Sequence, residues 1–383
     1  MIKAANTASR LRIPSPHATL GMALAGSGLW LALQNCNLPD ESLWLGCGLA
    51  VWGAVSVLTL PRPGMRLAQE FVAVVCLLLL GGELAVRHEN AAAQARYNER
   101  LMHFVADPVL RYEMQPHAGS APATTNAQGM LDRERTEAKP AATLRIACLG
   151  DSVGGDFELP RENACAVLET ELTRVLGGRR VEVLNFSVPG YNALQQARAM
   201  EVKAMRFDPD AVVVLYVHND PYPELAISHH LPGHLKFEHL LFNGVTWAVS
   251  RLRSVDAHPL VRLLAGLYEK AECWQGVVVT AFARMAATAL DHGDLPVVVA
   301  VFPLFTDPQS PLLQAAARRV VVEARRHDFI GVDLGPELLK DHTIAQLLKP
   351  SGDLIHPNAT AHRLAAQAIA KALFREAPHW GTR

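Results

Sequence analysis

Five residues of this sequence have the right chemistry for one reaction, provided that the fold brings them together. Ser152 lies in the triplet GDS, Gly190 in the motif VPGYN and Asn219 in the triplet HND. Asp353 and His356 lie in the motif SGDLIHPN. Acyl transfer needs a hydroxyl nucleophile, a base that takes its proton, an acid that orients the base, and donors for the developing oxyanion. Together the five residues supply all of these parts.

Each motif by itself also has an ordinary structural explanation. Gly, Asp and Ser are common in turns, so Ser152 could be a turn residue at the end of a strand. Gly190 could be a turn glycine, Asn219 a strand-end hydrogen-bonding residue and His356 a turn histidine. Asp353 and His356 are three residues apart, and on a turn before a helix this spacing lets the carboxylate reach one imidazole nitrogen while the other faces Ser152.

The elements that would position these residues form a predicted α/β domain. From residue 144, short apolar runs alternate with amphipathic stretches, which is typical of a parallel sheet covered by helices. The runs are almost continuously apolar, which indicates strands buried on both faces. The predicted strands are LRIACLG (144–150), VEVLNFS (181–187), AVVVLYV (211–217), PVVVAVFPL (296–304) and FIGVDL (329–334).

The candidate residues follow these strands or precede the last predicted helix, whose apolar stripe covers 364–373. In an open α/β sheet, ligands bind outside the carboxyl ends of the strands. We therefore expect all five residues at one edge of the sheet, where they could form a single site.

These motifs, in this order, resemble those of the SGNH (GDSL-type) hydrolases over about 108–375. The segment NAQGMLDRE (126–134) is also similar to one that often precedes the GDS strand in membrane-tethered bacterial members. The resemblance implies a flavodoxin-like fold with a five-stranded parallel sheet and an enzyme that acts on ester bonds without a cofactor or metal.

The resemblance also implies a role for each residue. Ser152 would be the nucleophile, His356 the general base and Asp353 its orienting partner. The amides of Ser152 and Gly190 and the side chain of Asn219 would form the oxyanion hole. Many members carry a hydroxyl residue two positions after the serine, where this chain has Gly154. We therefore expect a more flexible loop after Ser152 and a different acyl pocket.

Three apolar runs before residue 90 predict an N-terminal membrane region, residues 1–90. They cover about 18–37, 42–60 and 67–86, and each is close to the roughly 20 residues that span a bilayer. Basic residues before the first run and in the second loop predict a cytoplasmic N-terminus, with the rest of the chain outside the cytoplasmic (inner) membrane. A buried helical bundle, or two spans with reversed sidedness, are the alternatives.

The remaining chain is predicted to contain a linker and a catalytic domain. Residues 91–142 are rich in Pro, Ala, Thr and charge from about 107 onward, which predicts a tether or an extended segment lying on the domain. Residues 143–383 form the predicted catalytic domain. Its long connection at about 218–295 could be a lid, a membrane-facing element or scaffold.

Composition and missing motifs exclude several other functions. The net charge of −1 provides no basic surface for nucleic acid. There is no G-x-G-x-x-G or G-K-[ST] motif for nucleotides. The histidines at 229, 230 and 234 lack partners at metal-ligand spacing, so a solvated loop explains them better. Among six cysteines, only Cys165 and Cys273 are expected to be able to pair, with Cys148 a buried free thiol.

Three functions fit the site. The first is a membrane-anchored esterase that removes an acyl group, here O-acetyl, from a glycan or lipid outside the membrane. The second is an O-acyltransferase that acetylates an exported polysaccharide and works with a larger membrane partner. The third is a non-catalytic glycan-binding or assembly subunit, against which the complete set of catalytic residue types argues.

Overall fold

The structure of the protein is a computed structural model that describes residues 101–223, 259–349 and 355–376. These residues all belong to one compact unit of the chain, Val86–Arg383. Several features on which the sequence predictions rest lie outside the described residues, namely the three apolar runs 18–37, 42–60 and 67–86, the histidines His229, His230 and His234, and Asp353.

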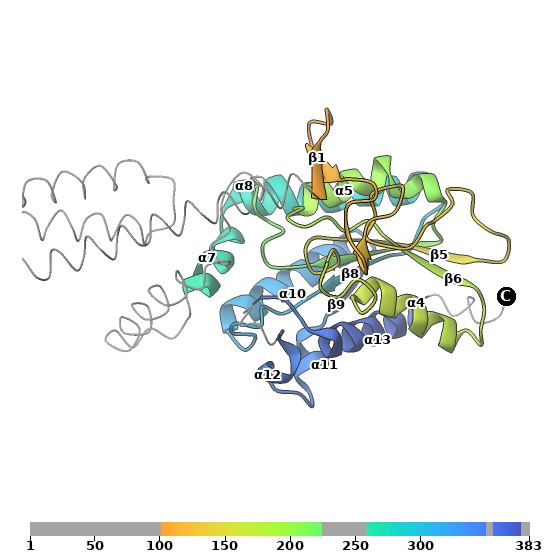
Figure 1. The fold of residues 1–383 in the computed structure, drawn as a ribbon. Helices are drawn as coiled ribbons and strands as arrows, with labels where there is room; N and C mark the ends of the chain where they lie inside the picture. The colour runs from red at the N-terminus through yellow and green to blue at the C-terminus, as the bar shows by residue number, and fades with distance from the viewer. Residues whose placement is uncertain (1–100, 224–258, 350–354, 377–383) are drawn as a thin grey trace, which may run out of the picture. The chain divides into compact units, whose positions relative to one another are not determined.

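A five-stranded sheet with parallel neighbours forms the centre of this unit (Figure 1). The strand order is β6-β5-β7-β8-β9. The strands are β5 (Leu144–Gly150), β6 (Val181–Asn185), β7 (Ala211–Tyr216), β8 (Val297–Val301) and β9 (Ile330–Asp333). The predicted α/β fold with a parallel five-stranded sheet is therefore confirmed.

The last four of the predicted runs extend beyond the strands that form. Pro296 and Pro303 flank β8, and proline has no N–H to donate to a neighbouring strand. In β6 the ladder ends at Asn185, yet the amides of Phe186 and Val188 still donate to Cys148 and Gly150 of β5. The chain after β6 therefore stays beside β5 as it enters the site.

Helices cover both faces of the sheet, as Figure 1 shows. One core contains α4 (Ala164–Val175), α11 (Gly335–Leu339), α12 (Ile344–Leu347) and α13 (Ala359–Glu376). The other contains α5 (Ala193–Val202), α7 (Pro259–Leu267), α9 (Thr280–Asp291) and α10 (Pro311–Arg326). Ile146 and Cys148 of β5 enter the first core, and Ala147 and Leu149 the second. Because successive strand residues face opposite layers, the whole strand has to be apolar.

The described part of the predicted insertion is helical over most of residues 259–291. Before α9 come α8 (Ala271–Cys273) and a π-helical turn, η2 (Trp274–Val279). Among the described residues, the continuous helix Ala271–Asp291 is the one candidate for a membrane span by length and composition. Half of its apolar window is buried inside the protein, as expected of a helix that packs on a sheet. Trp274, Val278 and Phe282 are among its buried residues.

Residues 101–142 pack onto the domain through short hairpins. One hairpin pairs β1 (Met102–Phe104) with β2 (Tyr112–Met114), and a second pairs β3 (Gly119–Ser120) with β4 (Ala123–Thr124). The buried apolar residues of this segment belong to the same core as α5 and α9; they include Leu110, Tyr112, Met114, Met130 and Leu131. The segment thus contributes to the fold of the catalytic domain.

One cysteine prediction is wrong. Cys148 of β5 forms a disulfide with Cys165 of α4, whereas Cys273 is a buried free thiol. The Cα atoms of Cys148 and Cys165 are 6.1 Å apart because the chain turns back after β5 and lays α4 along the sheet. The intervening segment carries Ser152, so the disulfide closes a covalent loop around the candidate nucleophile.

Candidate active site

Ser152 lies in a tight loop that begins directly after β5. The carboxylate of Asp151 accepts a hydrogen bond from the Val153 amide at 2.9 Å, and the Asp151 carbonyl accepts one from the Gly155 amide at 2.8 Å. These two bonds turn the chain back on itself at Ser152. Ser152 itself is half-buried.

His356 lies opposite this hydroxyl. Its Nε2 atom is 2.9 Å from Ser152 Oγ, although the two residues are 204 positions apart in the chain. His356 is close to the start of α13, as the sequence predicts. The contact matches what a general base requires, because Nε2 can accept the serine proton while Nδ1 is the atom that an orienting acid would bind. Asp353, the predicted acid, lies outside the described residues.

Asn219 follows β7, the next strand of the sheet. It comes directly after the buried His218. Its side-chain amide donates to Asp151 Oδ2 at 3.3 Å, and the same oxygen is 3.4 Å from Ser152 Oγ. Burial raises the pKa of Asp151, an effect opposed by the Val153 amide, His356 and Asn219. Asp151 therefore joins the side chains of Ser152 and Asn219, a contact that sequence analysis missed.

Gly190 follows β6 on the other side of Ser152. It occupies the left-handed region, with φ of +82°, inside a turn closed by the hydrogen bond from the Tyr191 amide to the Val188 carbonyl. Among the described residues, no hydrogen bond uses the Gly190 amide. The strand order β6-β5-β7 places Ser152 between Gly190 and Asn219, the two predicted oxyanion donors.

The loop after Ser152 differs from its expected flexible form. Gly154 and Gly155 are buried, and a Cβ atom on Gly154 would lie 2.1 Å from the Ser187 hydroxyl. A Cβ on Gly155 would lie 2.9 Å from Cδ of Pro189. These distances are far below van der Waals contact, so glycine is needed because the chain after β6 fills the space. The prediction of a loose loop is therefore wrong.

Two further polar residues near the site escaped the sequence analysis. Asn185, at the end of β6, donates to the Gly154 carbonyl at 2.8 Å and accepts from the Ser187 amide at 3.1 Å. His218 is buried, and its Nδ1 is 3.2 Å from the hydroxyl of Tyr268, which follows α7. Burial lowers the pKa of His218 to about 4. A polar residue at the end of an otherwise apolar run was the available signal in both cases.

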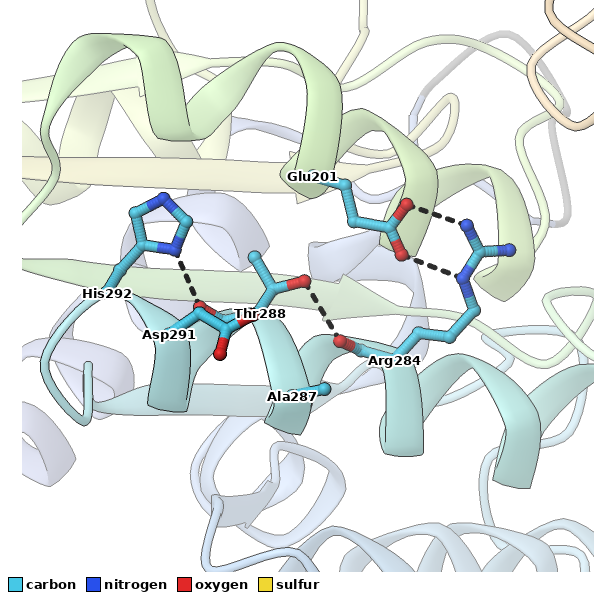
Figure 2. A pocket seen from close by; sticks show the side chains of 6 residues that line it. All are labelled: Glu201, Arg284, Ala287, Thr288, Asp291 and His292. Carbon is cyan, nitrogen blue, oxygen red and sulfur yellow. Dashed lines mark hydrogen bonds and ion pairs between the residues drawn. The ribbon is translucent and has the colours of Figure 1, made fainter.

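A separate hollow of about 390 Å³ lies between α5 and α9 (Figure 2). Its lining residues are Glu201, Arg284, Ala287, Thr288, Asp291 and His292. Figure 2 shows the double ion pair in which the Arg284 guanidinium donates to both Glu201 oxygens at 2.7 Å. None of the predicted site residues lines this hollow. Within the described ranges, no group of three His, Cys, Asp or Glu residues could hold a metal ion.

Comparison with known proteins decides the family. The model of the GDSL-like lipase/acylhydrolase family matches residues 148–364. The chain belongs to this family. This GDSL-family chain is accordingly a serine-type hydrolase of ester bonds, and the match includes Ser152, Gly190, Asn219, Asp353 and His356. The resemblance inferred from the motifs is thereby confirmed.

Several solved structures are similar to the GDSL-family chain. A variant of an acetyl xylan esterase from Geobacillus stearothermophilus is 16% identical, with a TM-score of 0.38, over 62% of this chain and 97% of that one. An α/β hydrolase from the metagenome of Lake Arreo is 19% identical, with a TM-score of 0.37, over 60% of this chain and 94% of that one. TesA is 16% identical, with a TM-score of 0.37, over 60% and 97% of the two chains. No curated protein matches the chain.

Proposed function

We propose that this chain is a membrane-anchored serine esterase that hydrolyses an acyl ester, here an O-acetyl ester, on a glycan or lipid outside the cytoplasmic membrane. The observation that carries the proposed chemistry is the 2.9 Å contact between Ser152 Oγ and His356 Nε2 at the carboxyl edge of the sheet. A serine and a histidine in hydrogen-bond reach are the nucleophile and base of an acyl-enzyme mechanism.

In the proposed reaction, His356 Nε2 takes the proton of Ser152 as Oγ attacks the acyl carbon. The oxyanion of the tetrahedral intermediate accepts hydrogen bonds from the amides of Ser152 and Gly190 and from the Asn219 side chain. The intermediate collapses to acyl-Ser152, and His356 returns the proton to the departing alcohol. Water then attacks the acyl group with His356 as base, which releases the acid and free Ser152. Asp353 orients His356.

Two observations support a site outside the cytoplasm. The three apolar N-terminal runs have the length of membrane spans, and their flanking charges favour an external catalytic domain. Independently, the disulfide Cys148–Cys165 is of a kind that forms and persists in oxidising compartments and is rare in the cytosol. Both cysteines are buried, at 0% and 1% exposure, so the bond is shielded from reductants in the folded state.

Acetate release tests the esterase against the transferase. We expect the purified full-length protein to release acetate from p-nitrophenyl acetate, with a rate unchanged by an added oligosaccharide acceptor. An unchanged rate would mean that water is the acyl acceptor, because hydrolysis needs no second substrate besides the ester. Transfer of an isotopically labelled acetyl group to the oligosaccharide would instead identify an O-acyltransferase. Release that persists in Ser152→Ala would contradict both reactions.

A reporter fusion and disulfide mapping test the compartment. A phosphatase that is active only outside the cytoplasm, fused after residue 90, is expected to be active because three spans place this point outside. Peptide mapping of the protein from the same cells, without reductant, is expected to recover Cys148 and Cys165 in one linked pair. An inactive phosphatase together with reduced cysteines would contradict the external location.

A further inference from the structure

A buried cluster of ionisable residues lies beside the candidate active site and has no part in the proposed reaction. Lys349 Nζ lies 2.9 Å and 2.8 Å from the two carboxylate oxygens of Asp156. The side chains are only 10% and 4% exposed, respectively. His362 of α13 completes the cluster, with Nε2 at 3.9 Å from Asp156 Oδ2. Asp156 lies in the loop that carries Ser152, and Lys349 precedes the segment that carries His356.

Asp156 and Lys349 form an ion pair in which both groups are charged at neutral pH. Burial would raise the pKa of Asp156, but His362 and Lys349 hold it below its usual range. Burial would lower the pKa of Lys349, but Asp156 and Glu158 raise it. Both groups are thus charged at neutral pH. Removing Lys349 would leave the Asp156 carboxylate buried without its cation, which disrupts local structure more than the loss of an exposed pair.

The ends of the segment that carries His356 are also held to each other. Leu348 and Pro357 form an isolated antiparallel bridge. The Asn358 side chain donates to the carbonyls of Leu348 at 3.0 Å and Gln346 at 2.9 Å, and its amide donates to the Leu347 carbonyl at 2.8 Å. This clamp fixes the two ends of the segment to each other. It does not join them to the loop of Ser152.

We propose that the ion pair between Lys349 and Asp156 joins these two parts and sets the distance between Ser152 and His356. This inference rests on the proposed function, because the distance matters for the proton transfer from Ser152. Lys349 and Asp156 are positioning residues: they lie next to the chain segments of the nucleophile and base and act through them. A displacement of about 1 Å at reacting groups can lower a rate by about 100-fold.

A fluorophosphonate probe tests this positioning role. The quantity measured is the rate at which the probe modifies Ser152 in the full-length protein. We expect Lys349→Met and Asp156→Asn each to lower the second-order rate constant by about 10-fold or more. The double variant should be no slower than the worse single variant, because both remove the same interaction. Lys349→Arg, which keeps the charge, should recover most of the rate. For p-nitrophenyl acetate, kcat should fall with little change in KM.

Glu158 provides the matched control. Its carboxylate is 3.0 Å from the same Lys349 Nζ, but its side chain is 72% exposed. Glu158→Gln removes the exposed carboxylate beside Lys349 and leaves the buried pair of Lys349 and Asp156 intact. Exposed ion pairs contribute little to stability. We therefore expect a change of less than about 2-fold in the labelling rate. A folded Lys349→Met protein that reacts at the wild-type rate would overturn the proposal, as would equal losses in Glu158→Gln and Lys349→Met.

Hydrogen exchange separates this proposal from the proposed function. If the wild-type protein does not react with the probe, the proposed function fails, and the exchange of the Asn358 amide then decides the positioning role. We expect this amide to exchange at least about 10-fold faster in Lys349→Met than in the wild type or Glu158→Gln, because its segment loses its attachment. Equal exchange in all three proteins would overturn the proposal.

Discussion

Ser152→Ala and His356→Ala are each expected to lower kcat/KM for p-nitrophenyl acetate by about 10⁴-fold or more. Alanine removes either the atom that attacks the ester or the base that takes its proton. Ser152→Ala should also abolish labelling by a fluorophosphonate probe, because the probe reacts with the serine oxygen. The two losses should not add in the double variant, since the residues act as one unit.

His292→Ala is the control for the histidine variant. His292 is exposed and lines the hollow between α5 and α9, away from the predicted site residues, so its loss should leave kcat/KM unchanged. The wild-type value should fall with pH across about pH 8 to 5, because a protonated imidazole cannot accept the serine proton. A flat profile over this range, or full activity in His356→Ala, would remove His356 from the role of base.

Arg145→Met is expected to lower the free energy of unfolding by about 3–5 kcal/mol. Arg145 is 0% exposed, and its guanidinium lies 2.6 Å and 3.0 Å from Glu182 Oε2. It also donates to the carbonyls of Glu137 at 2.9 Å and Phe207 at 2.8 Å. Methionine would fill the space but leave two carbonyls and a largely buried carboxylate without this donor. Denaturant unfolding of the full-length protein, followed by circular dichroism, measures the change.

Arg180→Met is the matched control, because Arg180 pairs with the same carboxylate at 2.9 Å from a side chain that is 60% exposed. Its loss should lower the free energy of unfolding by less than about 1 kcal/mol. Burial would raise the pKa of Glu182, but Arg145 and Arg180 hold it below its usual range. The stability from this pairing is therefore present at neutral pH and lost as pH falls below about 4.5. Equal losses in both variants would contradict the role of burial.

Local sequence patterns were enough to predict the sheet and most of the site. The strand β5 begins and ends where its apolar run does, at Leu144 and Gly150. Parallel strands buried on both faces need continuous apolar runs, and these runs are visible without a structure. Because such strands end at a common edge, the residues that follow them could be grouped in advance. Ser152 was placed at this edge in this way, and His356 was expected beside it because its motif precedes the last predicted helix.

The sequence alone could not reveal interactions between positions that no local pattern relates. The Cys148–Cys165 disulfide depends on how α4 returns along β5, and it contradicts the predicted free thiol. The interpretation of Gly154 as a flexible point was wrong because the space beside it is filled by Ser187, which follows a neighbouring strand. A sequence shows which residue types are present, but not which atoms occupy the space around them.

The chain by itself therefore determined its fold class, its family and the identity of the candidate nucleophile and base, since these follow from periodicity and from motifs in a fixed order. The tertiary structure decided the partners of the buried polar groups, such as Glu182 for Arg145 and Asp156 for Lys349. Burial makes an unpaired charge costly, so each of these groups needs a partner. Only the packing of distant segments decides which residue that partner is.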